Sequence, residues 1–263
     1  DMIHVLRTID PMLLERNREG FLNGHTPFSA IVAFLSFYTA YLIGAEHIVL
    51  SNESSANEGN LSGASVNHQY SKSFAFEHDF QQYAHKNLMP DIHYFSLLRP
   101  FNELQIAKYF AALPQYHAVF RSCNAGSKRN VWCRNCAKCL FVCGILSPFL
   151  PPEQLSAIFG ENLLERDELR EIFDGLAGFS PLKPFECVGT QEELRFALAL
   201  AARQYRARGE ALPALLQYFT QHADWEALSS DGSLLNAWNP QHEIPAAFQP
   251  YIKEMHNYAA GIA

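Results

Sequence analysis

In the first half of the chain, long stretches with a helical pattern alternate with short apolar runs. A nearly continuous apolar stretch at 27–43 predicts a buried helix, and amphipathic patterns at 71–88 and 101–114 predict two more helices. Short apolar runs predict three strands, at 47–51, 92–98 and 117–123. Because strands and helices alternate, the pattern predicts an α/β fold with parallel β-α-β units and helices on both faces of the sheet.

The second half of the chain has a different pattern. From about position 150 the apolar positions recur at helical spacing, and no strand pattern is present. Short amphipathic helices are predicted at 151–159, 165–178, 191–207 and 210–223. We therefore predict an α/β part at 1–150, ending in a cysteine cluster, and a helical part at 151–263.

The apolar stretch at 27–43 could also be read as a membrane helix. It is shorter than the roughly 20 residues that are needed to cross a bilayer. Small side chains also recur along one side of it at helical spacing, which allows a neighbouring element to approach closely. We therefore predict a buried helix and no membrane span.

The net charge and the cysteine content indicate which ligands and which cellular compartment to expect. The net charge is −7, and the 20 basic residues are scattered along the chain, which argues against nucleic-acid binding. Of the six cysteines, four fall within 17 positions. Such crowding favours a metal site in a reducing compartment over a secreted disulfide framework, so we predict a cytoplasmic protein.

The crowded cysteines follow the spacing C-x9-C-x2-C-x2-C, formed by Cys123, Cys133, Cys136 and Cys139. Four thiolates converging on one ion would form a closed, tetrahedral and therefore structural Zn²⁺ site. An iron–sulfur cluster is the rival, because C-x2-C-x2-C also begins the ferredoxin motif, and free buried thiols are a third possibility. Cys143 lies one helical turn further on in an apolar setting and is read as a core residue.

A dense polar loop follows the first predicted strand. Ligands bind outside the carboxyl ends of the strands in an open parallel sheet, so this loop is the candidate binding site. A solvated connecting loop remains the alternative. The candidate residues are Ser51, Asn52, Glu53, Asn60, Asn67, His68, Gln69, Ser71 and Lys72.

Two further segments offer candidates for the same site. Arg99 ends the second predicted strand, where its guanidinium group would suit an anionic ligand, although a salt bridge to Glu103 is the alternative. The proline-bounded loop at 181–189 carries Lys183 and Cys187, and we expect it to fold over the site. Cys187 has the alternative of a buried structural thiol.

Several motifs together resemble one family. They are NGHTP (23–27), SNESSANEGN (51–60), VNHQYSKSFAFE (66–77), YFSLLRPFNEL (94–104), FRSC (120–123), WCRNCAKCLFV (132–142) and KPFECVG (183–189). Over roughly positions 3–200 the chain resembles the MurL-type UDP-N-acetyl-α-D-muramoyl-L-alanyl-L-glutamate epimerases of bacterial peptidoglycan synthesis. More remotely, the cysteine spacing resembles the zinc site of 7-cyano-7-deazaguanine synthases.

The resemblance implies a PP-loop ATP pyrophosphatase, with a partial doubly wound parallel sheet like that of the adenine nucleotide α-hydrolases. It implies ATP and Mg²⁺ as reactants, UDP-MurNAc-L-Ala-L-Glu as the substrate, and a functional link to the ligase that adds L-glutamate to muramoyl-alanine. Adenylation of the terminal glutamate would acidify its Cα–H, and a base would then remove that proton. Glu53, His68 and Cys187 are the candidate bases, and His68 leads because its pKa lies nearest neutral pH.

One expected motif is absent from the sequence. PP-loop enzymes carry an SGGxDS loop whose backbone N–H groups bind pyrophosphate, and no such stretch occurs here. We therefore expect the chain to be a C-terminal portion of a longer protein and to release no pyrophosphate by itself. A PP-loop ligase that resembles the deazaguanine synthases and a non-catalytic, zinc-stabilised binding module remain the alternatives.

Overall fold

The computed structural model describes residues 2–22, 28–57, 70–181, 184, 186, 188–230 and 232–261. The strands are β1 (His47–Leu50) and β2 (His93–Ser96). The α-helices are α1 (Pro11–Arg18), α2 (Phe28–Ile43), α3 (Phe74–Asn87), α4 (Glu103–Ala111), α5 (Pro114–His117), α6 (Ala137–Leu146), α7 (Pro152–Phe159), α8 (Arg170–Ala177), α9 (Gln191–Arg208), α10 (Ala214–His222), α11 (Trp225–Ser230), α12 (Ser233–Asn236) and α13 (Gln249–Ala260). Short 3₁₀ turns include η1 (Ser54–Asn57) and η2 (Tyr70–Lys72). The fold is therefore mostly helical, with a small parallel sheet.

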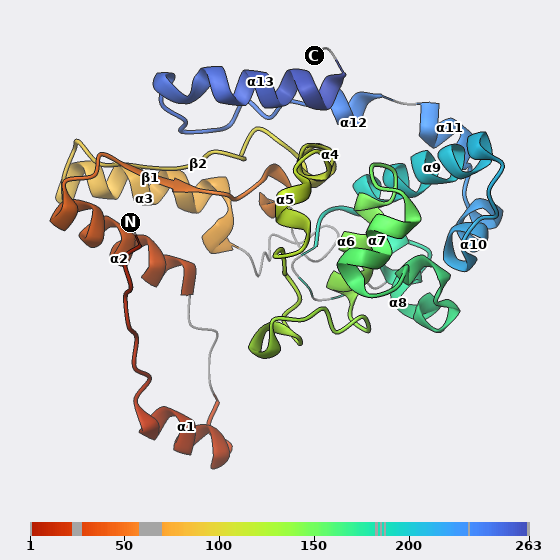
Figure 1. Cartoon of the computed structure of the whole chain (residues 1–263). Coiled ribbons are helices and arrows are strands. Elements are labelled where there is room, and N and C mark those ends of the chain that lie inside the picture. The colour runs from red at the N-terminus through yellow and green to blue at the C-terminus, as the bar shows by residue number, and fades with distance from the viewer. Residues whose placement is uncertain are drawn as a thin grey trace.

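The sheet lies between two helical layers. β1 and β2 pair in parallel, with His47 opposite His93. On one face Ile48 packs in a cluster with Phe80 of α3 and Ala33 of α2. On the other face lies α13, so α13 and α2 flank the strands from opposite sides (Figure 1). The predicted parallel β-α-β unit is confirmed for these two strands, which α3 connects.

The predicted strand at 117–123 is wrong. Pro114 occupies the first position of α5, where its fixed φ angle favours a helix, and that helix extends to His117. The next residues form a turn and then a segment that belongs to neither β1 nor β2, and Val119 is 68% exposed. The described residues thus contain a two-stranded sheet where the pattern predicted three strands.

The helix predicted at 27–43 is α2, but the prediction that it is buried is wrong for most of its length. Its buried residues are Ala33, Phe37 and Ala40, which face the sheet, whereas Leu42 and Ile43 are 61% and 59% exposed. In the described part of the chain no helix is long and apolar enough to cross a membrane.

Local sequence signals account for the helices beside the sheet. Ser73 caps α3 by accepting a hydrogen bond from the Phe76 N–H. Asn102 and Gln105 form a reciprocal capping box at the start of α4. These caps fix the points at which α3 and α4 begin.

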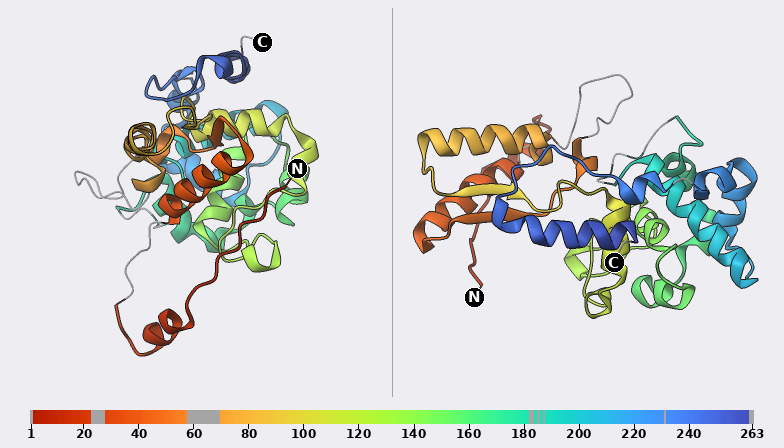
Figure 2. Two further views of the ribbon diagram at one scale, coloured as in Figure 1. Left: turned by 90° about the vertical axis from the view of Figure 1, so that its left-hand side faces the viewer. Right: turned by 90° about the horizontal axis from the view of Figure 1, so that it is seen from above.

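The helical region forms the largest core cluster and lies beside the sheet (Figure 2). Its central helix is α6, in which eight of the ten residues are buried and which packs against α4, α8 and α9. Cys143, in the middle of α6, is fully buried, as predicted for a core residue. Because α6 precedes position 150 and α8 and α9 follow it, this core spans both predicted parts, and the boundary at 150 stays a prediction.

Candidate functional site

The segment after β1 is held against the residues that follow β2. The Asn52 side-chain amide donates a hydrogen bond to the Ser96 hydroxyl at 3.0 Å. The Ser54 N–H and hydroxyl both donate to the Phe101 carbonyl at 2.9 Å. Ser51 and Glu53 alternate with these anchored residues, so their positions at the carboxyl end of the sheet are fixed.

A cavity of about 220 Å³ lies beside this segment. Ser51, Glu53 and Glu103 supply its polar groups. Its remaining walls are apolar and come from α4, α6 and the segment between α5 and the cysteines, including Ile106, Phe110, Phe120, Val142 and Leu146. The cavity therefore brings two carboxyl groups to an apolar pocket at the edge of the sheet where parallel sheets bind ligands.

A third, buried carboxyl group bonds to the backbone of Glu103, which lines the cavity. Glu193 is 2% exposed and accepts hydrogen bonds from the Glu103 N–H at 2.8 Å and the Thr190 N–H at 2.6 Å. Burial raises the pKa of Glu193, the hydrogen bonds from Thr190 and Glu103 oppose this shift, and the nearby charge of Glu53 adds to it. One side chain thus caps both α4 and α9 and places three acidic residues close together.

Arg99 is fully buried and contacts the protein itself. Its guanidinium donates to the Glu53 carbonyl, the Lys72 carbonyl and the Glu77 carboxylate, each at 2.8 Å. The ion pair is with Glu77 on α3, whereas the sequence suggested Glu103. Arg99 therefore connects the segment after β1 with the turn at η2. Its proposed role as an anion ligand stays a prediction.

Of the other predicted site residues, some lie in the described structure and some lie outside it. Lys72 lies in η2 with Ser71 and contributes the carbonyl that Arg99 binds. Several predicted residues lie outside the described residues, namely Asn60, Asn67, His68, Gln69, Lys183 and Cys187. The sequence reasoning missed Glu77 and Glu193. A signal for Glu193 was present, because Thr190 and Glu193 have the spacing of a capping box.

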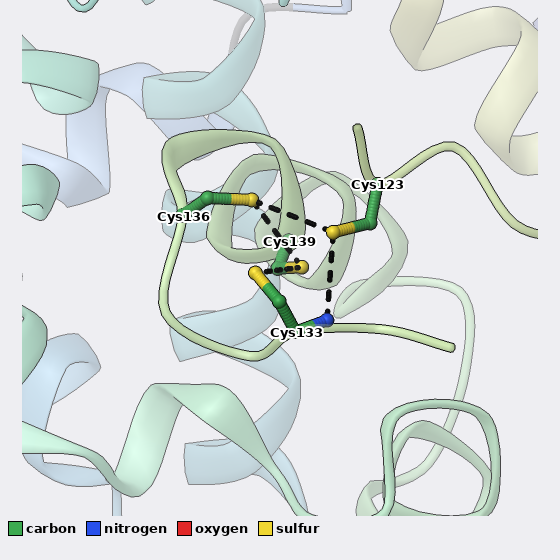
Figure 3. A group of neighbouring side chains, drawn as sticks. All are labelled: Cys123, Cys133, Cys136 and Cys139. Atoms are coloured by element: carbon green, nitrogen blue, oxygen red, sulfur yellow. Dashed lines mark hydrogen bonds between the residues drawn. The ribbon is translucent and has the colours of Figure 1, made fainter. Parts of the chain in front are cut away.

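The four clustered cysteines converge as the spacing predicted, although Cys123 belongs to a segment outside the sheet (Figure 3). Their sulfur atoms all lie within 4.8 Å of one another. The separations are 3.9 Å for Cys123–Cys136, 3.7 Å for Cys133–Cys139 and 3.5 Å for Cys136–Cys139. Four sulfurs at about 2.3 Å from a tetrahedral Zn²⁺ would lie about 3.8 Å apart, so the donor set and its geometry fit zinc.

The environment of the cluster favours a thiolate at Cys136. Backbone N–H groups of Gly126 and Cys133 donate to the Cys123 sulfur at 3.2 and 3.4 Å. The hydrogen bond between Cys136 and Cys139 lowers the pKa of Cys136 to about 5 and raises the pKa of Cys139, and burial raises the pKa of Cys133. Cys136 is also the N-cap of α6, where the helix dipole stabilises negative charge. Thiolates are the form that binds metal.

The cysteine cluster is connected to the cavity through α6. Cys136 and Cys139 lie at the first turn of that helix, and Val142 and Leu146 of the same helix line the cavity. Phe120, three residues before Cys123, lines another wall. An ion bound by the four thiolates would therefore hold two cavity walls in place.

Two family models match this sequence. The MurL N-terminal domain matches residues 1–97, and the MurL C-terminal domain matches residues 119–230. Together they cover most of the chain. The chain belongs to the MurL family. This confirms the resemblance seen in the sequence motifs.

Curated relatives carry the same name, UDP-N-acetyl-alpha-D-muramoyl-L-alanyl-L-glutamate epimerase. One from Xanthomonas oryzae pv. oryzae is 40% identical over 80% of this chain and 49% of its own length. One from Micromonospora sp. is 36% identical over 95% of this chain and 56% of its own length, and one from Salinispora tropica is 41% identical over 75% and 45%. The chain thus spans about half the length of these relatives. No solved structure matches it.

Proposed function

We propose that this chain supplies part of an epimerase that inverts the terminal L-glutamate of UDP-MurNAc-L-Ala-L-Glu during bacterial peptidoglycan synthesis. The observation that carries the proposal is membership of the MurL family, whose curated members bear that activity in their names. The carboxyl-lined cavity at the end of β1 and β2 is consistent with it. A cytoplasmic location and a link to the ligase that adds L-glutamate belong to the same proposal.

The cavity suits the end of such a substrate. Its volume of about 220 Å³ lies below the range of about 300–1,000 Å³ that is usual for ligand pockets. It could take the terminal glutamyl group, while the sugar and nucleotide would lie outside it. The apolar walls from α4 and α6 would exclude water from the reacting Cα, so proton exchange would occur through protein groups.

Inversion requires two proton transfers. A base removes the Cα proton from one face of the glutamyl residue, and an acid returns a proton to the opposite face. Glu53 is the described residue best positioned for one of these transfers, because it lines the cavity and its backbone is anchored by Arg99. Glu103 faces the same cavity. His68 and Cys187 remain candidates for the second transfer.

The requirement for ATP and Mg²⁺ belongs to the proposal for the full-length protein. The sequence has no SGGxDS stretch, the loop whose backbone N–H groups cradle a pyrophosphate in PP-loop enzymes. Activation of the glutamate through an acyl adenylate and the PP-loop fold are implied by the resemblance alone. We assign both to the full-length enzyme, of which this chain would form the part that surrounds the carboxyl-lined cavity.

We further propose that Cys123, Cys133, Cys136 and Cys139 bind one structural Zn²⁺. The support is the match between their sulfur separations and a tetrahedral site. Zinc would replace the weak contacts between thiols with four bonds and would fix the start of α6. Because four protein ligands complete the coordination, no position is left for substrate, and the ion would stabilise the fold.

The assignment of Glu53 can be tested in the full-length Xanthomonas oryzae relative. The residue aligned with Glu53 is replaced by Gln, and exchange of the glutamate Cα–H with solvent deuterium is measured. The matched control is the same change at the position aligned with Glu226, which is exposed on α11. A well-placed acid or base contributes about 10²- to 10⁴-fold, so exchange should fall by that factor only in the first variant. Equal exchange in both variants would remove Glu53 from the reaction.

A further inference from the structure

The two edges of the parallel sheet differ in their hydrogen bonding. The His93 N–H donates to the Glu46 carbonyl at 2.8 Å, and the Leu97 N–H donates to the Leu50 carbonyl at 2.9 Å. Backbone groups along a strand point alternately to one side and the other. The odd-numbered residues of β2 therefore face β1, and the even-numbered ones face the outer edge of β2.

The outer edge of β2 is closed by side chains of α3. Gln81 accepts a hydrogen bond from the Tyr94 N–H at 2.5 Å, and Glu77 accepts one from the Ser96 N–H at 3.1 Å. Both acceptors are buried. The two outward N–H groups of β2 are thus satisfied within the chain, and no further strand is needed on that side.

The outer edge of β1 has no such closure. The same alternation directs the N–H and carbonyl groups of His47 and Val49 away from β2. In the part of the chain that the structure describes, no side chain or backbone group forms a hydrogen bond with these outward groups. Val49 is 46% exposed although it lies in a strand. Unpaired edges of this kind are sites at which another strand can add.

The surface next to this edge is apolar. A gap of about 430 Å³ runs along α2 and β1, and Ile3, Val5, Leu35 and Ile43 are among the side chains that line it. Ile43 is 59% exposed and Leu35 is 38% exposed. Residues 2–9 border the gap but form no strand in the described structure. An open polar edge and an exposed apolar helix face therefore lie side by side.

A two-stranded sheet is small by general rules, since sheets usually contain about 4–6 strands. Helices already cover both faces of this sheet, so it can grow only at an edge. The curated relatives contain about as much chain again as this sequence matches, since it covers 49%, 56% and 45% of their lengths. That additional chain is sufficient to supply further strands and helices.

We propose that the outer edge of β1, with the apolar face of α2, is an interface for a β-strand from the part of the MurL epimerases that this sequence does not match. The strand would pair with the backbone of His47 and Val49, and its apolar side chains would fill the gap beside Leu35 and Ile43. The two parts would then share one continuous sheet, whose carboxyl edge carries the cavity at Glu53. This proposal rests on family membership and does not depend on the proposed reaction.

Amide hydrogen exchange tests the proposal on the proteins as they exist. In this chain alone, the amides of His47 and Val49 should exchange about 100-fold or more faster than those of Ile48 and Leu50, which bond to β2. In the full-length Xanthomonas oryzae epimerase, all four amides of the aligned strand should be slow. Fast exchange of the two outward amides in the full-length enzyme would overturn the proposal. Slow exchange of them in this chain that depends on its concentration would identify a second copy as the occupant and would also overturn it.

A proline substitution separates edge pairing from general stability. Val49→Pro removes an N–H that β2 does not use, so Ile48 and Leu50 in this chain should keep their protection. At the aligned position of the full-length enzyme, the same proline should abolish the slow exchange of the neighbouring outward amide. Threonine, which keeps the N–H, should leave it unchanged. An effect of proline no larger than that of threonine in the full-length enzyme would contradict strand addition at this edge.

Discussion

The buried ion pair between Arg99 and Glu77 offers a sharp perturbation of the site. Their side chains are 0% and 1% exposed, and the closest nitrogen and oxygen lie 2.8 Å apart. Glu77→Gln keeps the size of the side chain but removes the negative charge that compensates Arg99. Ser96 also loses an acceptor, because its N–H and its hydroxyl each bond to one of the Glu77 oxygens.

The structure indicates the size of the effect. Removing one partner of a buried ion pair costs about 3–5 kcal/mol, because a charge is left buried and uncompensated. Arg99 retains its bonds to the Glu53 and Lys72 carbonyls, so we expect a loss near 3 kcal/mol, the lower end of that range. Domains are stable by about 5–15 kcal/mol, so Glu77→Gln should be clearly destabilised but still folded.

Urea unfolding followed by circular dichroism measures this loss. The control is Glu226→Gln, in which the same chemical change is made at a 75% exposed carboxylate, 3.9 Å from Arg206. Because exposed ion pairs contribute little, the control should unfold at the same urea concentration as the wild type within error. If Glu77→Gln also unfolded at the wild-type urea concentration, Arg99 would have an alternative partner or access to water, and the reasoning on this network would be refuted.

Three further predictions concern other parts of the structure. Purified, unchelated protein should contain about one equivalent of zinc, and Cys133→Ser should lose the metal and unfold at lower urea concentration, because metal binding contributes directly to folding. Gly189→Ala should cost about 1–3 kcal/mol in urea unfolding, because its Cβ would lie 2.6 Å from a Glu193 oxygen and 2.8 Å from the Phe141 ring. The pKa of Glu193 is raised in the folded protein, so its contribution to the free energy of unfolding is greatest below the ordinary pKa of a glutamate. That contribution is lost as the pH rises through the pKa of Glu193 in the folded protein. Glu193→Gln should therefore flatten this part of the pH–stability curve.

Each of these predictions has an outcome that contradicts it. Iron with labile sulfide, or a disulfide between any two of the four cysteines, would replace the zinc assignment. Wild-type stability of Gly189→Ala would mean that the Phe141 ring moves freely, against its full burial. An unchanged pH dependence in Glu193→Gln would show that other groups determine it.

Local signals explain why much of the fold could be predicted. The apolar run of α2, the Ser73 cap of α3 and the Asn102–Gln105 capping box of α4 each involve residues within one or a few turns of one another. The spacing of the cysteines likewise predicted their convergence. In all these cases the interacting residues are close in sequence, or belong to a pattern that has few structural solutions.

The failures have physical causes as well. The apolar run at 117–123 resembled a strand, but Pro114 favoured a helix at its start, and no neighbouring strand pairs with it in the described structure. Arg99 and Glu77 are 22 residues apart, and nothing in the sequence marks them as partners. Glu193 was missed although the spacing of Thr190 and Glu193 is that of a capping box, and its bond to the Glu103 N–H depends on how α4 and α9 pack.

The most direct test of the proposed function is to follow the glutamate Cα in a full-length MurL-family epimerase in deuterated water. UDP-MurNAc-L-Ala-L-Glu is incubated with enzyme, ATP and Mg²⁺, and the configuration and deuterium content of the terminal glutamate are measured. We expect inverted glutamate carrying deuterium at Cα only when ATP is present, and no pyrophosphate release by the present chain alone. Inversion without deuterium uptake, or equal inversion without ATP, would contradict the account.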